Sequence, residues 1–366
     1  MMTKFSSLQA LLAHPVDTII DVRSPAEFAE DHVPGAINLP VLDNEERAEV
    51  GTIYKQVSPF RARKLGAAMV FRNAARHIEI ALAHHEGGWR PLVYCWRGGQ
   101  RSGAFAWMLR EIGWRAEVID GGYRSFRRMV VAAMYDAPVG LPLVRVGGLT
   151  GTAKTEILGH LAGLGAQVID LEALANHRGS LLGARDTPQP SQKAFETALA
   201  VACARMDPGL PCIVEAESSK IGALTLPPSF WAAMKTAPIL EVTAPLSARA
   251  AYLARAYEDI LADTELLREK LSPLRRVRGA KTLEAWDALM EAGDKVALCR
   301  ALAEDHYDPA YRRAQAAWSG VARQEVPLPD LAPDTLAGAA ARILGAAQRI
   351  CTAPVPGTKR PTTAAS

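Results

Sequence analysis

The sequence predicts two α/β domains in one chain, and three observations carry this prediction. The chain has 366 residues, more than twice the usual domain length of about 150 residues. Short apolar runs alternate with amphipathic stretches, which is typical of a mainly parallel sheet covered by helices. Residues 137–142 contain two prolines and a glycine, which interrupt any helix or strand. We therefore expect an α/β domain over 1–136, a linker over 137–142, an α/β domain with a helical C-terminal part over 143–350, and a disordered tail over 351–366.

The composition is that of a packed globular protein. Hydrophobic residues make up 49% and charged residues 22% of the chain, which excludes global disorder and a collagen-like repeat. The formal net charge is only +3, so an anionic partner must be bound by local basic clusters. Five scattered cysteines indicate reduced thiols and a cytoplasmic protein. No apolar stretch reaches about 18 residues, and we expect no membrane span.

The first domain opens with a strand at 19–22 and a helix whose start is marked by a capping box. Ser24 can cap this helix, Pro25 suits its first position, and Glu27 closes the box. The alternation of apolar runs with amphipathic stretches then predicts an extended segment at 37–39, a long helical region over 53–83, a strand at 92–94, a helix over 102–112, a strand at 118–119 and a helix over 123–134.

The second domain begins directly after the linker. Short runs rich in branched apolar residues predict strands at 143–146, 167–169, 213–216 and 239–242, with a helix over 155–164. Beyond residue 247 the pattern is mostly helical, to about residue 348.

A cysteine, Cys95, stands at the end of a predicted strand, and an arginine, Arg101, follows six positions later where a helix begins. Loop N–H groups and the positive end of the helix dipole would converge on the sulfur and lower its pKa. Arg97 and Arg101 would hold an oxyanion, and Gly98 and Gly99 let the backbone curl around it. A lone cysteine is more often a buried structural residue. That interpretation explains neither the paired glycines nor the arginines, so Cys95 is a candidate nucleophile.

A glycine-rich loop follows the first strand of the second domain and leads into a helix, which is the context of a phosphate-binding loop. The candidate diphosphate ligands are Gly148, Thr150, Gly151, Thr152, Ala153, Lys154 and Thr155. Lys154 would contact the outer phosphate oxygens, and the Thr155 hydroxyl would bind Mg²⁺. Ala153 stands where the usual pattern has glycine, which disfavours tight binding of a nucleotide.

Four further residues of the second domain are candidate site residues. Glu215 and Glu217 lie where P-loop enzymes often place a carboxylate that organises a metal, although a solvated strand end is almost as frequent. His177 and Arg178 lie in a loop after the second strand, where they either contact substrate or cap a helix. The other four cysteines lack metal-ligand spacing and are expected to be structural.

Basic residues form three clusters that are candidate RNA-binding surfaces. The first contains Arg61, Arg63, Lys64, Arg72 and Arg76, the second contains Arg124, Arg127 and Arg128, and the third contains Lys270, Arg275, Arg276, Arg278 and Lys281. Each cluster by itself is more often a solvated helix face. Because phosphate contacts supply most nonspecific affinity for nucleic acid, three clusters beside two anion sites favour an RNA partner.

The first domain resembles rhodanese-type sulfurtransferases. Four segments are similar to the signatures of that fold and follow in the expected order: 21–28, 32–38, the loop from Cys95, and 120–123. The resemblance covers about the first 135 residues. The spacing from Cys95 to Arg101 is one residue longer than in the usual sulfurtransferase loop and matches the related dual-specificity phosphatases. The wider cradle could accept a phosphate or a selenium species.

A rhodanese-like domain joined to a P-loop domain resembles the bacterial tRNA 2-selenouridine synthases. Five further segments strengthen this match across both domains, namely 46–56, 170–172, 176–180, 189–193 and 215–222. The resemblance implies that selenium replaces sulfur in 2-thiouridine at the tRNA wobble position. Selenophosphate would be the donor, and an S-geranylated intermediate would be made from geranyl diphosphate.

The same resemblance implies roles for the two loops. Cys95 would serve the selenium-transfer step, with Arg97, Arg101 and the loop amides holding selenophosphate. The P-loop would bind geranyl diphosphate, with Lys154 and Mg²⁺ at Thr155 stabilising the departing diphosphate. The implied partners are tRNA and an enzyme that supplies selenophosphate.

Two other functions remain open on the sequence. One is a rhodanese-type sulfurtransferase or a cysteine-dependent phosphatase fused to a nucleotide-binding, kinase-like domain. The phosphatase would release phosphate from an aryl phosphate through Cys95, whereas the synthase would not. The other is a noncatalytic RNA-binding protein, against which the intact Cys95, Arg101, Lys154 and Thr155 argue.

Overall fold

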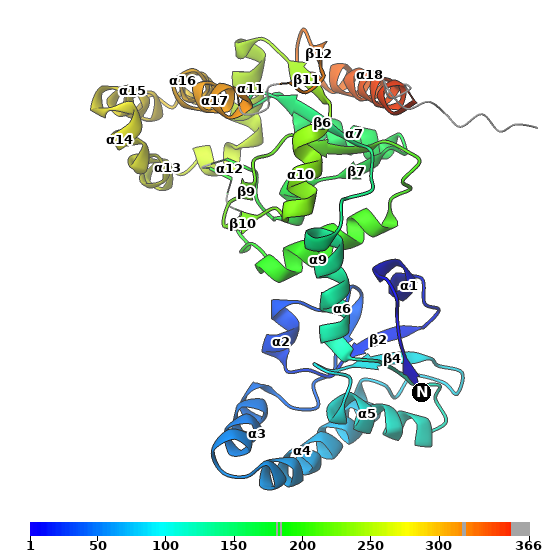
Figure 1. Cartoon of the computed structure of the whole chain (residues 1–366). Coiled ribbons are helices and arrows are strands. Elements are labelled where there is room, and N and C mark those ends of the chain that lie inside the picture. The colour runs from blue at the N-terminus through cyan, green and yellow to red at the C-terminus, as the bar shows by residue number, and fades with distance from the viewer. Residues whose placement is uncertain (181, 184, 317–319, 353–366) are drawn as a thin grey trace, which may run out of the picture. The chain divides into compact units, whose positions relative to one another are not determined.

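The computed structural model describes residues 1–180, 182–183, 185–316 and 320–352, and the chain divides into two compact units (Figure 1). The first unit contains Met1–Val139, Gln189–Arg205 and Pro227–Ser229, and the second contains Gly140–Pro188, Met206–Leu226 and the chain from Phe230 onward. Each unit is built on a parallel sheet, which confirms the predicted fold class. The division differs from the expected domain ranges mainly at residues 189–205, which lie in the first unit.

The first unit has a five-stranded parallel sheet in the order β1-β5-β4-β2-β3. Its strands are β1 (Met2–Thr3), β2 (Thr18–Asp21), β3 (Ala36–Asn38), β4 (Pro91–Tyr94) and β5 (Glu117–Ile119). All four residues of the central strand β4 are buried, as expected for a parallel strand covered on both faces. Asp21 pairs in register with Tyr94, so β2 and β4 end side by side just before Cys95.

Seven α-helices of the described chain belong to the first unit. They are α1 (Leu8–Leu12), α2 (Pro25–Glu30), α3 (Asn44–Gln56), α4 (Pro59–Ile80), α5 (Gln100–Glu111), α6 (Gly122–Val131) and α9 (Gln192–Arg205), and a π-helical turn, η1 (Ala132–Asp136), continues α6. The capping box predicted at Ser24 and Glu27 is present at the start of α2.

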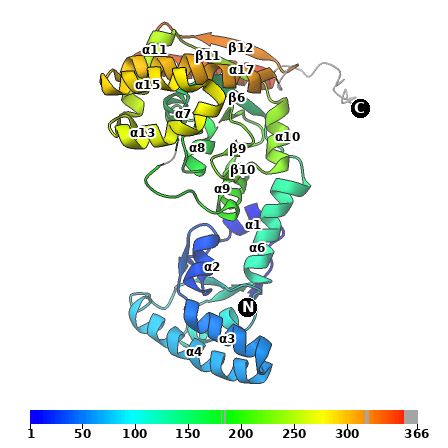
Figure 2. The ribbon, with the colours of Figure 1, turned by 90° about the vertical axis from the view of Figure 1, so that its left-hand side faces the viewer.

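The long helical region predicted over 53–83 is interrupted at Val57 and Ser58 and ends at Ile80. Two helices, α3 and α4, occupy this part of the chain and pack side by side (Figures 1 and 2). The Ser58 side chain caps α4, and Pro59 occupies its first turn. Proline has no N–H to donate and cannot continue the preceding helix, so the chain turns here.

The core of the first unit lies between the sheet and helices α4 and α5. Val93 and Val118 of the sheet pack in one cluster with Val70 of α4 and Phe105 and Leu109 of α5. Cys95 belongs to the same cluster. The cysteine loop therefore stands on the rigid core.

Helix α9 is joined to the first unit by polar contacts. Thr197 donates a hydrogen bond to Asp31 at 3.0 Å, and Tyr123 donates to the same carboxylate oxygen at 2.8 Å. Glu196 forms an ion pair with Arg127 of α6. A helix encoded within the second half of the sequence thus completes the first unit.

The second unit has a five-stranded parallel sheet in the order β12-β11-β6-β8-β7 and a separate antiparallel hairpin. The sheet strands are β6 (Leu143–Gly148), β7 (Gln167–Ile169), β8 (Cys212–Glu215), β11 (Ile239–Thr243) and β12 (Arg323–Pro327), and the hairpin strands are β9 (Lys220–Ile221) and β10 (Leu224–Thr225). The expectation of a helical chain after residue 247 is wrong at β12. This edge strand is exposed at four of its five residues, so its sequence lacks the apolar alternation of a strand.

Helices cover this sheet and form a separate helical part. They are α7 (Lys154–Gly163), α8 (Leu171–Leu174), α10 (Pro228–Thr236), α11 (Leu246–Ala256), α12 (Glu258–Leu261), α13 (Thr264–Leu271), α14 (Arg275–Arg278), α15 (Ala280–Glu291), α16 (Lys295–Leu302), α17 (Asp308–Ala316) and α18 (Pro333–Thr352), with short turns η2 (Ser272–Leu274) and η3 (Ala303–Tyr307). Helices α7 and α18 pack together over the sheet, and a second core surrounds Trp286 of α15.

The prediction of a disordered tail over 351–366 is wrong at Cys351 and Thr352, which belong to α18. The rest of that prediction, residues 353–366, lies outside the described residues. None of the helices in the described part of the chain has both the length and the apolar character that a membrane span requires.

Candidate functional site

Cys95 lies at the carboxyl end of β4, directly before the turn into α5, and is 4% exposed. The Ser102 hydroxyl donates a hydrogen bond to its sulfur at 3.1 Å. Burial alone would raise the pKa of the Cys95 thiol, but hydrogen bonds from the Ser102 hydroxyl and backbone, the charge of Arg101 and the Gly99 amide lower it below its ordinary value. The site therefore favours a nucleophilic thiolate.

The loop after Cys95 presents backbone amides that donate to no carbonyl in the described part of the chain. Within the described residues, no backbone carbonyl accepts a hydrogen bond from the amides of residues 96–99. These amides lie before the N-terminus of the twelve-residue helix α5, in the loop for which the sequence predicts an anion cradle.

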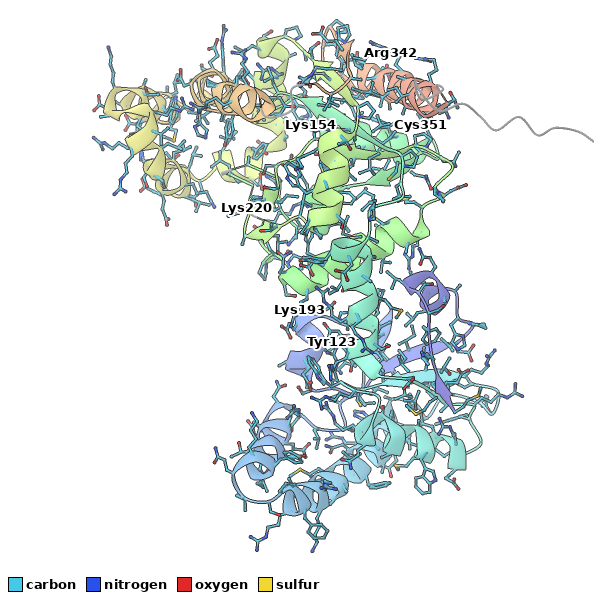
Figure 3. The ribbon with its side chains drawn as sticks, viewed as in Figure 1. Tyr123, Lys154, Lys193, Lys220, Arg342 and Cys351 are labelled. Carbon is cyan, nitrogen blue, oxygen red and sulfur yellow. The ribbon has the colours of Figure 1, made fainter. Side chains whose placement is uncertain are left out.

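Two glycines from separate segments set the shape of this loop. Gly98 has φ of +64°, and a Cβ there would lie 2.5 Å from the Ile119 carbonyl oxygen. Gly122 has φ of +57°, and a Cβ there would lie 2.2 Å from the Cys95 carbonyl oxygen. The amide of Tyr123, at the start of α6 (Figure 3), donates to that same carbonyl at 2.8 Å. The segment 120–123 therefore holds the cysteine loop in place.

The two arginines of the cysteine loop differ in their surroundings. Arg101 donates to Glu27, the capping-box residue of α2, at 3.2 Å. Burial would raise the pKa of Glu27, but the charge and hydrogen bond of Arg101 lower it, so the pair is ionic. Arg97 is exposed. Arg101 is thus held beside the loop, while Arg97 extends into solvent.

The phosphate loop joins β6 to α7 in the second unit. Gly148 and Gly151 have φ of +150° and +84°, and the Thr152 hydroxyl donates to the Leu149 carbonyl at 2.8 Å. The Lys154 ammonium donates to the Gly148 carbonyl at 2.9 Å (Figure 3). These contacts produce the strand–loop–helix arrangement that the sequence predicts.

Ala153 caps α7 in the left-handed conformation, with φ of 58°. This conformation costs a residue other than glycine about 1 to 2 kcal/mol. Its methyl group is buried in the core cluster with Ile157 and Leu158, which offsets part of the cost. The departure from the usual glycine is therefore accommodated by packing.

Three carboxylates lie beside the phosphate loop. Glu172 of α8 accepts a hydrogen bond from the Thr155 hydroxyl at 3.2 Å, and its amide donates to Glu215 at 2.7 Å. Burial, together with Asp170 and Glu217, raises the pKa of Glu215 well above its usual value. Burial and the neighbouring Glu172 raise the pKa of Glu217 to about 7. Glu172 was not singled out from the sequence as a site residue, and the signal for it is its place directly after β7.

These groups line a cavity of about 700 Å³. Its polar wall contains the residues from Thr150 to Thr155 and the three carboxylates, and its other wall is largely aromatic and aliphatic, with Trp231, Tyr252, Leu253, Tyr257, Tyr307 and Tyr311. A smaller pocket shares Thr150, Leu253, Tyr257 and Tyr307 with it and adds the apolar side chains Leu182, Leu261 and Leu302. The phosphate loop therefore opens onto an apolar surface.

The structure separates His177 from Arg178. Arg178 lines the cavity, pairs with Asp259 at 2.8 Å and lies over the Tyr257 ring at 5.1 Å. His177 accepts a hydrogen bond from the Gly179 amide at 3.1 Å and is not among the described residues that line the cavity. Of this pair, only Arg178 is placed to contact a ligand there.

The basic clusters differ in how many of their side chains are exposed and free of an ion pair within the described residues. On α4, Arg61, Arg63, Lys64 and Arg76 are exposed, whereas Arg72 pairs with Glu46 at 2.9 Å. In the second cluster, Arg127 is paired with Glu196, whereas Arg124 and Arg128 are exposed.

In the third cluster, Arg275 and Arg276 are exposed and line a surface hollow. Arg278 instead donates to the His306 carbonyl at 3.1 Å. The basic residues most open to phosphate groups are therefore on the α4 face, at Arg124 and Arg128, and at the Arg275–Arg276 pair.

Comparison with known proteins matches both units. The family described as "Rhodanese-like domain" matches residues 5–129, and the family described as "tRNA 2-selenouridine synthase AAA domain" matches residues 141–321. The chain is similar to three curated proteins named tRNA 2-selenouridine synthase. The protein of Chromohalobacter salexigens is 40% identical over 74% of this chain and 75% of its own length. The protein of Nitrosomonas europaea is 36% identical over 75% of this chain and 71% of its own length. The protein of Hahella chejuensis is 34% identical over 80% of this chain and 84% of its own length.

Proposed function

The chain belongs to the family of tRNA 2-selenouridine synthases, enzymes of tRNA modification, and from this premise we propose the reaction that its two sites carry out. Selenium from selenophosphate replaces the sulfur of 2-thiouridine at the tRNA wobble position. The replacement passes through an S-geranylated intermediate made from geranyl diphosphate. It takes place in the cytoplasm, with tRNA as the substrate and a selenophosphate-supplying enzyme as a partner.

The observation that carries this proposal is the cavity of about 700 Å³ in which the phosphate loop faces an aromatic and aliphatic wall. A diphosphate with a hydrocarbon tail has one strongly anionic end and one end without hydrogen-bonding groups. The loop around Lys154 suits the first end. Trp231, Tyr252 and Leu253 of the same cavity suit the second end.

In the geranylation step, the sulfur of 2-thiouridine bonds to C1 of the geranyl group while the C–O bond to the diphosphate breaks. Lys154 and the amides of the phosphate loop stabilise the charge that develops on the leaving diphosphate. The proton on N3 of the base is released.

The Thr155 hydroxyl and the Glu172 carboxylate are oxygen donors of the kind that Mg²⁺ prefers. Within the described residues, no cluster of three His, Cys, Asp or Glu side chains suits a metal ion, so Mg²⁺ would bind together with the diphosphate. When bound, the ion offsets the negative charge of the leaving group.

Cys95 serves the selenium-transfer step in the first unit. In that step selenium from selenophosphate bonds to C2 of the base while the C2–S bond breaks and geranylthiol leaves, and water takes up the phosphoryl group as phosphate. The Cys95 thiolate, which the lowered pKa of the thiol favours, is the anionic side chain of this site. The amides of residues 96–99 and Arg101, with Arg97 at the rim, hold selenophosphate or its product anion.

The proposal is tested by mass spectrometry of tRNA nucleosides from cells that carry single variants and grow with selenium. Cys95→Ser should abolish 2-selenouridine while S-geranylated nucleoside remains. Lys154→Ala should lower both products, because it removes the loop's charge from the diphosphate. Cys351→Ser, at a partly buried thiol of the second unit, is the matched control and should keep both products. Normal 2-selenouridine in the Cys95→Ser strain would remove Cys95 from the mechanism.

A second candidate function is a cysteine-dependent phosphatase. The spacing from Cys95 to Arg101 and the Ser102 hydroxyl on the Cys95 sulfur favour it. Purified protein that hydrolyses an aryl phosphate, with activity lost in Cys95→Ser, would support this function. Absence of such hydrolysis alongside 2-selenouridine formation would exclude it.

A further inference from the structure

The outer side of α4 keeps large aromatic rings in solvent. Phe60 is 73% exposed and Phe71 is 42% exposed, and Trp107 of the neighbouring helix α5 is 52% exposed. The rings of Phe71 and Trp107 meet edge to face, with centroids 6.3 Å apart. Single exposed apolar residues are common, but a group of rings on one side of a helix is typical of a binding surface.

The helical spacing brings these rings into line with a basic residue. Phe60, Lys64, Ala67 and Phe71 follow one another at intervals of four, three and four residues and are all exposed. Side chains at these intervals lie on the same side of an α-helix. Eleven residues at 1.5 Å each separate Phe60 from Phe71 by about 16 Å along the axis. The small Ala67 leaves the surface open between the two rings.

The charge on this helix favours an anionic occupant. Helix α4 carries five Lys and Arg residues and one acidic residue, Glu79. Arg61, Arg63 and Lys64 are exposed, and they form no salt bridge with any residue in the described part of the chain. A second copy of the chain would bring like charges together here, whereas nucleic acid offers both phosphates and flat apolar bases.

Rings that stack on bases need bases that are unpaired. In duplex RNA both faces of every internal base are covered by its neighbours, whereas loops can splay their bases onto aromatic side chains. We propose that Phe60 and the Phe71–Trp107 pair stack on unpaired bases of the substrate tRNA, while Arg61, Arg63 and Lys64 contact the flanking phosphates. The identity of the RNA as tRNA rests on the proposed function.

The test measures binding of the purified full-length protein to a labelled anticodon stem-loop over a series of salt concentrations. Phe60→Ala should weaken binding about ten-fold, the loss expected for one stacked base, with no change in the salt slope. Phe60→Trp should restore the affinity. Lys64→Ala should lower the log–log salt slope by about 0.7 to 0.9, because it removes a phosphate contact. Ile80→Ala is the matched control, since Ile80 is an equally prominent side chain of α4, 68% exposed, but has no ring.

Three results would overturn this inference. Unchanged affinity in Phe60→Ala would exclude stacking by this ring. An equal loss for a fully paired RNA duplex without a loop would show that unpaired bases are not the ligand. Dissociation of a dimer by Phe60→Ala, seen in sedimentation with RNA affinity unchanged, would make this face an interface between copies of the chain. Because binding is measured without selenium or geranyl diphosphate, these results are independent of the nucleoside analysis that tests the proposed function.

Discussion

Cys95 differs from the other cysteines in what surrounds its sulfur rather than in how deeply it is buried. Cys212 and Cys299 are also buried, and burial raises the pKa of their thiols to about 12 and about 11. At Cys95 the same desolvation is outweighed by hydrogen bonds from Ser102 and by the nearby Arg101. A few polar groups at the start of one helix therefore decide which thiol ionises.

Alkylation by iodoacetamide at a series of pH values should show this difference. Cys95 should reach half its maximal rate at a pH below that of a free cysteine, because its folded-state pKa is lowered and the thiolate is the reactive form. Ser102→Ala should move that midpoint to higher pH, since the thiolate loses a hydrogen-bond donor. An unchanged midpoint in Ser102→Ala, read from the Cys95 peptide by mass spectrometry, would contradict the role given to Ser102.

Gly98 and Gly103 provide a paired test of the loop geometry. Gly98→Ala should disrupt the cysteine loop, because the new Cβ would meet the Ile119 carbonyl oxygen at 2.5 Å in a left-handed conformation. Gly103→Ala, within α5, meets nothing within 4 Å and should stabilise the protein by about 0.5 to 1 kcal/mol through higher helix propensity. Thermal unfolding and the alkylation rate of Cys95 report both effects. Equal behaviour of the two variants would refute the steric argument.

At the scale of elements, α14 divides the third basic cluster into two kinds of arginine. The short turn from Arg275 to Arg278 exposes Arg275 and Arg276 and directs the Arg278 guanidinium onto the His306 carbonyl. The sequence grouped all three as possible RNA ligands. Only the contact with η3 separates the structural arginine from the two that are available.

The double variant Arg275→Ala/Arg276→Ala should weaken tRNA binding and lower its log–log salt slope by about 1.4 to 1.8, the sum of two phosphate contacts. Arg278→Ala should leave the slope unchanged and lower the thermal stability, because His306 loses its hydrogen-bond partner. Filter binding over a salt series and thermal unfolding distinguish the two variants. A slope that falls only in Arg278→Ala would reverse this assignment.

At two other places the local sequence pattern did not predict the secondary structure correctly. The break between α3 and α4 depends on Ser58 and Pro59, a cap followed by a proline, which is a local signal that the sequence contained. β12 carries no such signal. It is a strand because Arg323 to Pro327 pair with β11 at the sheet edge, and such pairing is not visible in the strand's own residues.

At the scale of the whole molecule, the first unit depends on a helix encoded far along the chain. The side chain of Glu196 on α9 is 3% exposed and pairs with Arg127, which is itself largely buried. Thr197 and Tyr123 share the Asp31 carboxylate, and the Tyr123 amide holds the Cys95 carbonyl. The support of the cysteine loop therefore includes residues from both halves of the sequence.

Glu196→Ala should destabilise the protein by about 2 to 3 kcal/mol, because it leaves the mostly buried Arg127 guanidinium without its carboxylate and with only the Lys193 carbonyl as acceptor. Lys193→Ala, on the same helix, removes an ion pair with Glu30 that is 41% and 49% exposed, and should cost less than about 1 kcal/mol. Urea unfolding monitored on the first unit measures both. A cost for Lys193→Ala as large as that for Glu196→Ala would show that α9 is not anchored through Glu196.

The sequence by itself determined the features that contiguous residues encode. These are the strand, turn and helix around Cys95, the phosphate loop before Lys154 and the capping box at Ser24. Each arises from backbone conformations and hydrogen bonds that span only a few residues. The residue types that favour it therefore stand close together in the sequence and can be recognised there. Only the tertiary structure decided that Glu172 meets Thr155, that Gly122 closes over the Cys95 loop and that α9 packs on the first unit. Those contacts join residues that are far apart in the chain, and their free energy comes from burial and pairing that exist only once the sheets and helices have packed.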